Sequence, residues 1–169
     1  ENKITIVKRK KSQCQDNTLM SSVILDFLQS NQGIKIEDEE IIVLLQATSP
    51  VRQEKDLKMA LHLFSSSTDI DLLMAVTQVD NSPLKYGFVV NGNFKHIAEP
   101  NMCFENRQNL PKLFRPTGTF YIFKAGWYRK NKSLATKFTR AYEIPSNQSL
   151  DIDSFDDLHQ FESILRKKG

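Results

Sequence analysis

The feature that most constrains the fold is the alternation of unbroken apolar runs with amphipathic segments. Residues 41–45 (IIVLL) and 72–76 (LLMAV) contain no alternating polar positions, which is typical of strands buried on both faces of a parallel sheet. Apolar residues at helical spacing occur within residues 19–28 and 57–64. This order predicts an α/β fold of Rossmann-like type, with a mostly parallel sheet and helices on both faces.

Shorter signals predict further elements. Residues 4–7 (ITIV) and 119–123 are rich in β-forming types and are expected to be strands, and Asp16 is expected near the cap of the helix at 19–28. Residues 149–153 are expected to end a strand, and an amphipathic helix is expected to follow them. Ser154 and Asp157 have the spacing of a capping box at its start.

The middle of the chain predicts a projecting β-hairpin. Residues 87–90 and 94–97 are β-prone and flank Asn91-Gly92-Asn93, and Asn-Gly is a strong signal for a tight hairpin turn. We therefore expect an α/β core at 1–83 and 119–169. A separate hairpin and loop region is expected at 84–118, together with part of 125–141.

Composition excludes several classes of protein. The 169 residues, 40% of them hydrophobic, are enough for one sizeable core. The net charge of +3 is too small to indicate a nucleic-acid-coating protein. No apolar run approaches the roughly 20 residues that cross a bilayer, and Cys14 and Cys103 lack metal-ligand spacing. Without the pattern of a signal peptide, we expect a cytoplasmic protein that binds neither nucleic acid nor membrane.

A polar loop follows the first apolar run. Gln46, Thr48, Ser49 and Arg52 offer hydrogen-bond donors at the carboxyl end of a predicted parallel strand, where open α/β sheets bind ligands. They could bind phosphate or sugar hydroxyls. The alternative is an ordinary strand-to-helix turn with Ser49 as the cap.

Charged residues form two further candidate groups. Asp151 and Asp153 are two positions apart, so on a strand they would share a face and could bind one Mg²⁺; alternatively, Asp153 caps the last helix and Asp151 is solvated. Lys85, Arg107 and Arg115 each lie near a proline and could converge on a carboxylate or phosphate. The alternative for each cation is a solvated surface charge.

Together these stretches resemble the acylneuraminate cytidylyltransferases, also called CMP-N-acetylneuraminic acid synthetases. The resemblance extends over nearly the whole chain. The matching segments are residues 9–16 with Thr18, 44–52 (LLQATSPVR), 83–85, Arg107 with 110–111, 114–118 (FRPTG) with 121–122, and 149–153 (SLDID) with 157–158.

The resemblance implies a reaction and a site. CMP would pass from CTP to a nine-carbon 2-keto sugar acid, N-acetylneuraminate or an analogue such as legionaminic acid, and pyrophosphate would leave. Catalytic roles would fall to Asp151, Asp153, Lys85 and Arg115, with both aspartates binding Mg²⁺. The substrate site would comprise Gln46, Ser49, Lys85, Arg107, Arg115, Thr117 and Tyr121.

The resemblance also implies a homodimer, formed partly by the hairpin region and by residues from 125–141. The family usually begins with a strand and a basic loop that binds the CTP phosphates, and this sequence is expected to start after that loop. The fragment alone is therefore expected to be inactive. The alternative is a non-catalytic remnant that acts as a binding or regulatory module.

Overall fold

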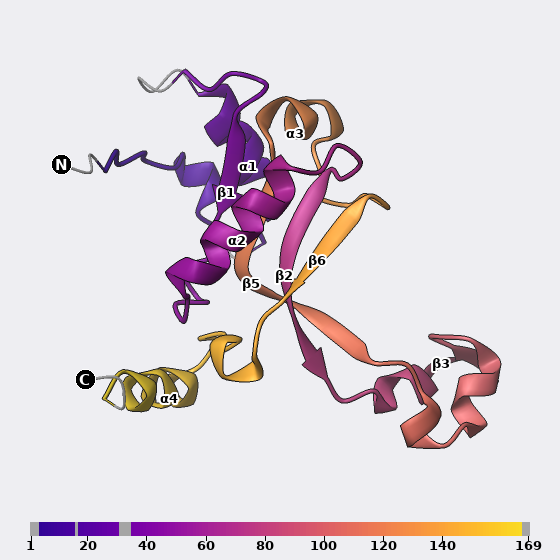
Figure 1. Ribbon diagram of the computed structural model, residues 1–169. Helices are drawn as coiled ribbons and strands as arrows, with labels where there is room; N and C mark the ends of the chain where they lie inside the picture. Colours follow the sequence, from indigo (N-terminus) through magenta and orange to yellow (C-terminus); the bar gives the residue numbers. More distant parts are fainter. Residues whose placement is uncertain (1–3, 16, 31–34, 167–169) are drawn as a thin grey trace. The chain divides into compact units, whose positions relative to one another are not determined.

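The computed structural model describes residues 4–15, 17–30 and 35–166 (Figure 1). The helices are α1 (Met20–Gln29), α2 (Glu54–Ser65), α3 (Ala125–Asn131) and α4 (Phe155–Arg166). The strands are β1 (Ile41–Leu44), β2 (Leu72–Val79), β3 (Gly87–Val90), β4 (Asn93–His96), β5 (Leu113–Lys124) and β6 (Thr139–Glu143). Short 3₁₀ turns include η2 (Ser82–Lys85), η3 (Pro100–Phe104), η4 (Arg107–Asn109) and η5 (Ser146–Gln148).

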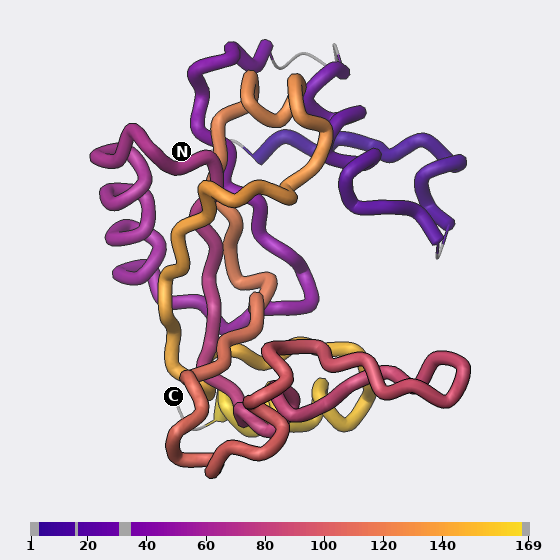
Figure 2. The backbone as a smooth tube through the Cα atoms, turned by 90° about the vertical axis from the view of Figure 1, so that its right-hand side faces the viewer, coloured from indigo at the N-terminus to yellow at the C-terminus, as the bar shows by residue number. Residues whose placement is uncertain are grey.

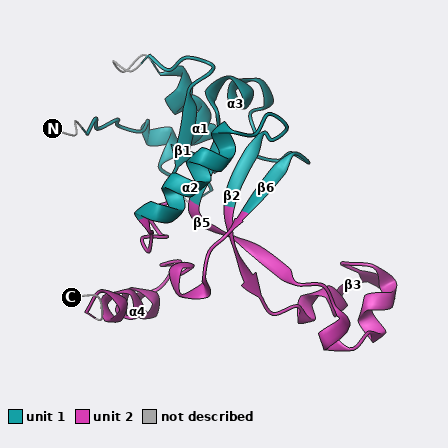
Figure 3. Ribbon diagram, viewed as in Figure 1, with its two compact units in different colours: residues 1–45, 54–74, 120–141 teal, residues 46–53, 75–119, 142–169 magenta. Residues whose placement is uncertain are grey.

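The chain divides into two compact units (Figure 3). The first unit comprises Glu1–Leu45, Glu54–Met74 and Phe120–Ala141, and the second comprises Gln46–Gln53, Ala75–Thr119 and Tyr142–Gly169. The sequence predicts a different division, into an α/β core and a hairpin and loop region at 84–118. That division follows the expected elements and not spatial compactness, and it stays a prediction.

The main sheet has four strands in the order β1-β5-β2-β6. It is mostly parallel, as the apolar runs predicted. Strand β5 is an exception, because it pairs antiparallel with β1 and places Ile42 opposite Phe123 and Leu44 opposite Tyr121. The α/β class expected from the sequence is confirmed.

The core of the first unit lies between two helices and the sheet. Ile24 and Leu28 of α1 pack with Phe123 of β5 and Tyr128 of α3, and all four are buried. The Tyr128 hydroxyl donates to the carbonyl of Ser21 at 3.1 Å, so this large buried side chain keeps a partner for its polar end. Figure 2 shows α2 on the other side of the strands from α1, which confirms that helices cover both faces.

The second unit contains the predicted hairpin. Strands β3 and β4 pair antiparallel, with Gly87 opposite His96 and Val90 opposite Asn93. The turn residues Asn91 and Gly92 have φ values of 52° and 76°, as a tight turn of the Asn-Gly type requires. The expected hairpin is confirmed.

Two expected strands are absent from the described residues. Residues 4–7 form no strand, and Ile4 and Ile6 are 90% and 87% exposed. Residues 149–153 form no strand either, although the amide of Ile152 donates to the carbonyl of Thr48 at 2.8 Å. Both segments contain β-forming residues, but propensity produces a strand only where a pairing edge is offered.

Other expectations are corrected in detail. Strand β1 is only partly buried, because it is the terminal strand in the order of the described sheet, whereas β2 is buried on both faces. No sequence signal predicted α3, which is short, or β6, which lacks a clear period. Asp16 lies outside the described residues. Within the part of the chain that the structure describes, no helix has both the length and the apolar character needed to cross a membrane.

Candidate active site

The polar loop at Gln46–Gln53 is attached to β5 through main-chain contacts. The amide of Gln46 donates to the carbonyl of Gly118 at 3.2 Å, and the amide of Ser49 donates back to Gln46 at 3.2 Å. Gly118 has φ of 69°, and a Cβ atom there would collide with the Gln46 side chain and lie 2.7 Å from Ser49 Oγ. The close approach of the loop to β5 therefore depends on glycine.

Arg52 fastens the same loop from its other end. Its Nε donates to the carbonyl of Thr119 at 3.0 Å, and its Nη2 donates to the carbonyl of Gln46. Burial lowers the pKa of the Arg52 guanidinium below its ordinary value. The sequence indicates Arg52 as a donor to phosphate or sugar, whereas in the structure two of its N–H groups bind main-chain carbonyls.

Ser49 connects the loop to two distant segments. Its hydroxyl is buried and lies 2.7 Å from the carbonyl oxygen of Thr117 and 3.3 Å from Asp151 Oδ1. Thr117 is also buried, and its hydroxyl lies 3.3 Å from the carbonyl of Ala75 and 3.0 Å from Thr119 Oγ1. The structure therefore brings three of the expected site residues together, and the substrate-binding role of Thr117 stays a prediction.

Arg115 and Asp151 share a cavity of about 470 Å³ in the second unit. Arg115 Nη2 donates to the carbonyl of Ser149 at 3.0 Å, which holds the guanidinium over the segment that leads to Asp151. The cavity therefore contains a cation and two carboxylates. Its lining consists of Arg115, Ser146, Asn147, Ser149, Leu150, Asp151, Asp157, Gln160 and Ile164.

Two residues of this lining, Asn147 and Gln160, were not expected from the sequence. Gln160 follows Asp157 by three positions, and residues three apart on a helix lie on the same side. Helical spacing could therefore have identified Gln160 once Asp157 was taken as a marker. Asn147 lies in η5, and nothing in its sequence context distinguishes it from other loop residues.

Asp153 and Asp151 line different cavities. Asp153 is exposed and lines a cavity of about 280 Å³ with Phe155 and Leu158. Its amide donates to Asp157 Oδ2 at 3.2 Å, and the amide of Ser154 donates to the same oxygen at 2.8 Å. The hydrogen bond from the Ser154 hydroxyl is the largest cause of a lowered pKa of Asp157, and the two backbone hydrogen bonds lower that pKa further. The predicted capping box is confirmed, since the amide of Asp157 also donates to Ser154 Oγ at 3.3 Å.

Lys85 and Arg107 occupy another part of the second unit. Lys85 Nζ donates to the carbonyl of Glu105, and Arg107 pairs with Asp80 and lines a cavity of about 620 Å³. The hydrogen bond from the Ser82 side chain, with smaller contributions that include the Arg107 charge, lowers the pKa of Asp80. Both cations therefore contact protein groups other than Asp151.

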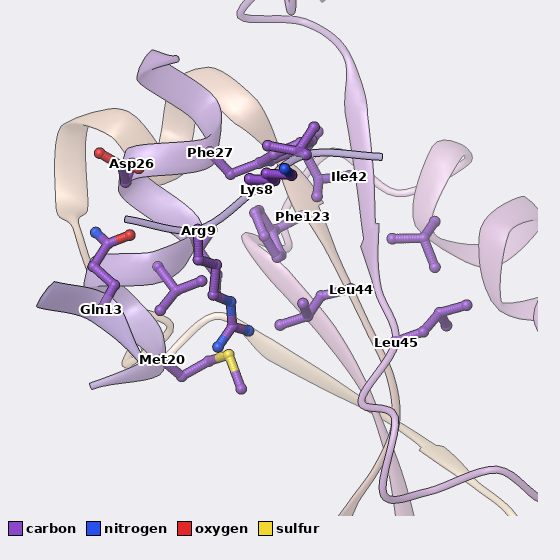
Figure 4. A pocket seen from close by; sticks show the side chains of 14 residues that line it. Lys8, Arg9, Gln13, Met20, Asp26, Phe27, Ile42, Leu44, Leu45 and Phe123 are labelled. Atoms are coloured by element: carbon purple, nitrogen blue, oxygen red, sulfur yellow. The ribbon is translucent and has the colours of Figure 1, made fainter. Parts of the chain in front are cut away.

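The remaining expected site residue, Tyr121, lies in the first unit, where β5 pairs with β1. That unit has a cavity of its own, about 410 Å³, between α1 and β1 (Figure 4). Its lining is mainly apolar and includes Met20, Phe27 and Leu44, and Figure 4 shows the Arg9 guanidinium directed toward Met20 and Leu44. This cavity was not expected from the sequence.

The donor chemistry of Asp151 and Asp153 fits Mg²⁺ in one respect. Mg²⁺ is commonly bound by one or two carboxylates, and water and substrate phosphates supply the remaining oxygens. Among residues 4–15, 17–30 and 35–166, no three His, Cys, Asp or Glu side chains gather closely enough to form a complete protein site. A partial site of two carboxylates is therefore the arrangement to test.

Comparison with known proteins defines the class first. A solved structure of CMP:2-keto-3-deoxy-manno-octonic acid synthetase complexed with CTP matches 91% of this chain and 70% of its own, with a TM-score of 0.60 and 10% identity. The chain therefore shares the α/β fold of this synthetase. No known family profile matches the chain.

Sequence relatives give a second comparison. The chain is 30% identical over 165 residues to an N-acylneuraminate cytidylyltransferase of Streptococcus agalactiae serotype III (strain NEM316), covering 93% of this chain and 37% of the relative. It is 26% identical over 163 residues to post-translational flagellin modification protein B of Campylobacter coli, covering 96% of this chain and 68% of that protein. The chain is thus a homologue of the N-acylneuraminate cytidylyltransferases, as its motifs indicated, and spans 37% of the length of the first of these relatives.

Proposed function

We propose that the protein containing this chain transfers CMP from CTP to a nine-carbon 2-keto sugar acid and releases pyrophosphate. The observation that carries the proposal is the meeting of Ser49, Thr117 and Asp151, with Arg115 and Asp151 lining one cavity. The reaction requires groups that position a charged sugar and a triphosphate. This site offers a polar loop beside a strand end, a carboxylate and a cation.

In this reaction the anomeric 2-hydroxyl oxygen of the sugar acid attacks the α-phosphorus of CTP. The new P–O bond forms as the bond to the departing pyrophosphate breaks, pyrophosphate leaves with the electron pair, and the hydroxyl proton passes to water. Arg115 has N–H groups beyond those that contact the carbonyls of Ser149 and Pro116, and we assign them to the sugar carboxylate or a phosphate oxygen. Positioning and charge neutralisation supply the catalysis, without a protein nucleophile.

We assign Asp151 and Asp153 to Mg²⁺, which when bound would neutralise charge on the triphosphate as pyrophosphate leaves. Asp151 Oδ1 is near the Ser49 hydroxyl at 3.3 Å, so the loop helps to orient this carboxylate. Gln46, Ser49, Thr117 and Tyr121 are proposed to contact substrate, together with Lys85 and Arg107.

We also propose that the protein forms a homodimer through the hairpin β3–β4. Phe88, Val89, Val90 and Phe94 of the hairpin are all exposed large apolar side chains, and contiguous exposed apolar surface commonly marks an interface. The hairpin edges offer backbone groups for pairing as well. Cys14 and Cys103 are both free thiols, consistent with a reducing compartment, and we place the reaction in the cytoplasm.

The test is a pyrophosphate-release assay with the full-length protein that contains this sequence. The assay supplies CTP, Mg²⁺ and a panel of keto sugar acids: N-acetylneuraminate, legionaminate and the eight-carbon 2-keto-3-deoxy-manno-octonate as a comparator. Release with a nine-carbon acid and not with the eight-carbon acid supports the proposal. Failure with every nine-carbon acid, from a folded protein, would overturn it and leave the non-catalytic binding module as the better reading.

A further inference from the structure

Cys103 and His96 form a side-chain pair that the proposed reaction does not use. His96 ends β4 and Cys103 lies in η3, and His96 Nδ1 is 3.0 Å from Cys103 Sγ. The same sulfur lies 3.0 Å from the carbonyl oxygen of Lys85. Both side chains are partly buried, so the pair is sheltered and still reachable by small reagents.

The geometry points to Cys103 as an activated thiol, with His96 as its base, that is modified by soft electrophiles and peroxides. A thiolate is the reactive form of cysteine, and a neighbouring imidazole both accepts the thiol proton and stabilises the thiolate that remains. The Phe94 ring meets the His96 ring edge to face, with 4.9 Å between ring centroids, which limits rotation of the imidazole away from the sulfur.

The chemistry balances without a further cofactor. With a maleimide, the proton passes from sulfur to His96 Nδ1, sulfur adds to the double bond, and the resulting enolate takes a proton back. With a peroxide, sulfur attacks one oxygen as the O–O bond breaks. Sulfur is then oxidised by two electrons to a sulfenic acid, and the departing oxygen is reduced and protonated to water or an alcohol.

Modification also changes what the sulfur can donate. The thiol has one hydrogen, which it gives either to His96 or to the Lys85 carbonyl, and an alkylated sulfur has none to give. Lys85 ends η2, and η2 packs against η3. The modification therefore removes one of the contacts between these two turns.

Cys14 provides an internal control in the same chain. It is exposed, and its thiol makes a weak contact with the carbonyl of Lys10 at 3.5 Å. Accessibility alone would make Cys14 the faster thiol. Activation by His96 instead makes the partly buried Cys103 faster.

The test is time-resolved mass spectrometry of the native full-length protein that contains this sequence, with limiting N-ethylmaleimide at neutral pH. We expect Cys103 to react at least about tenfold faster than Cys14, and the order to disappear in urea. His96→Gln should slow Cys103 about tenfold and leave Cys14 unchanged. His62→Gln, a change in α2, should alter neither rate.

Cys14 reacting as fast as Cys103 or faster in the native protein would overturn the proposal, as would a Cys103 rate that His96→Gln leaves unchanged. If His96→Gln fails to fold, both thiols will react at their urea rates, and the wild-type ratio then decides alone. Hydrogen peroxide followed by a sulfenic-acid trap should label Cys103 before Cys14. The opposite order would also contradict the proposal.

Discussion

Ser49 and Asp151 are 102 positions apart in the sequence, and Ser49 Oγ nevertheless lies 3.3 Å from Asp151 Oδ1. The same hydroxyl lies 2.7 Å from the carbonyl oxygen of Thr117. A hydroxyl has one hydrogen, so it donates fully to only one of these acceptors at a time. The buried serine therefore links three segments of the second unit.

Ser49→Ala should lower the free energy of unfolding by about 1–3 kcal/mol, because the carbonyl of Thr117 would lose a donor in a buried position. Urea denaturation measures the change. Ser66→Ala is the matched control, since the Ser66 hydroxyl donates to the carbonyl of Leu63 at 3.2 Å in an exposed position. Equal losses of unfolding free energy in the two variants would show that the burial of Ser49 does not strengthen the contribution of its hydrogen bond to stability.

Gly118→Ala should destabilise the protein more than Gly92→Ala. Both glycines have positive φ, 69° and 76°, so both substitutions incur backbone strain of about 1–2 kcal/mol. A Cβ atom at Gly92 meets nothing within 4 Å, whereas at Gly118 it would collide with Gln46. The collision should add about 1–3 kcal/mol in chemical denaturation. Similar losses at both positions would mean that Gln46 moves away freely.

Asp151→Asn should lower kcat about a hundredfold in the full-length protein, if this carboxylate helps to hold the metal charge at the α-phosphate. Asp153→Asn should also lower kcat, and stability should change little in both. Asp156→Asn, in the first turn of α4, is the charge-matched control and should leave kcat unchanged. Full turnover in both Asp151→Asn and Asp153→Asn would contradict the metal assignment.

The pKa of Asp80 is lowered in the folded protein, first by the Ser82 side chain and further by the Arg107 charge. The carboxylate therefore stabilises the fold above its unfolded pKa of about 4, and this stabilisation is lost as pH falls through the lower folded pKa. Thermal unfolding of wild type and Asp80→Asn should differ most above about pH 4 and converge in stronger acid. A difference that persists unchanged in strong acid would refute the role of Asp80.

Val89→Lys should weaken self-association at least about tenfold if the hairpin forms the dimer interface, because a buried unpaired ammonium is costly. Val89 is 73% exposed in β3. Met59→Lys, at a residue of α2 that is 60% exposed, is the matched control and should leave association unchanged. Sedimentation measures both. If the dimer persists in Val89→Lys, its interface does not include the hairpin.

The elements with strong periodicity could be predicted from the sequence. The apolar spacing of α1 and α2 and the Asn91-Gly92 turn depend on local chemistry, and the structure confirms all three. Residues 4–7 could not be judged in the same way, because their β-forming side chains say nothing about whether a pairing edge is present.

The candidate site was predictable in its residue types more than in its geometry. The strand-end rule located the loop that contains Gln46 and Ser49. Its contact with Asp151 joins residues 102 positions apart, and no local sequence pattern encodes such a contact. Asp151 and Asp153 were paired on the assumption of a strand. Since the segment is not a strand, spacing of two no longer places both carboxylates on one face.

Arg52 binds the carbonyl oxygens of Gln46 and Thr119, which every amino acid possesses. Relatives could therefore exchange the side chains at both partner positions while the arginine itself stays fixed, because lysine lacks the forked shape that reaches two acceptors. An evolutionary covariation signal between Arg52 and its partners should accordingly be weak, although the contacts are physically direct.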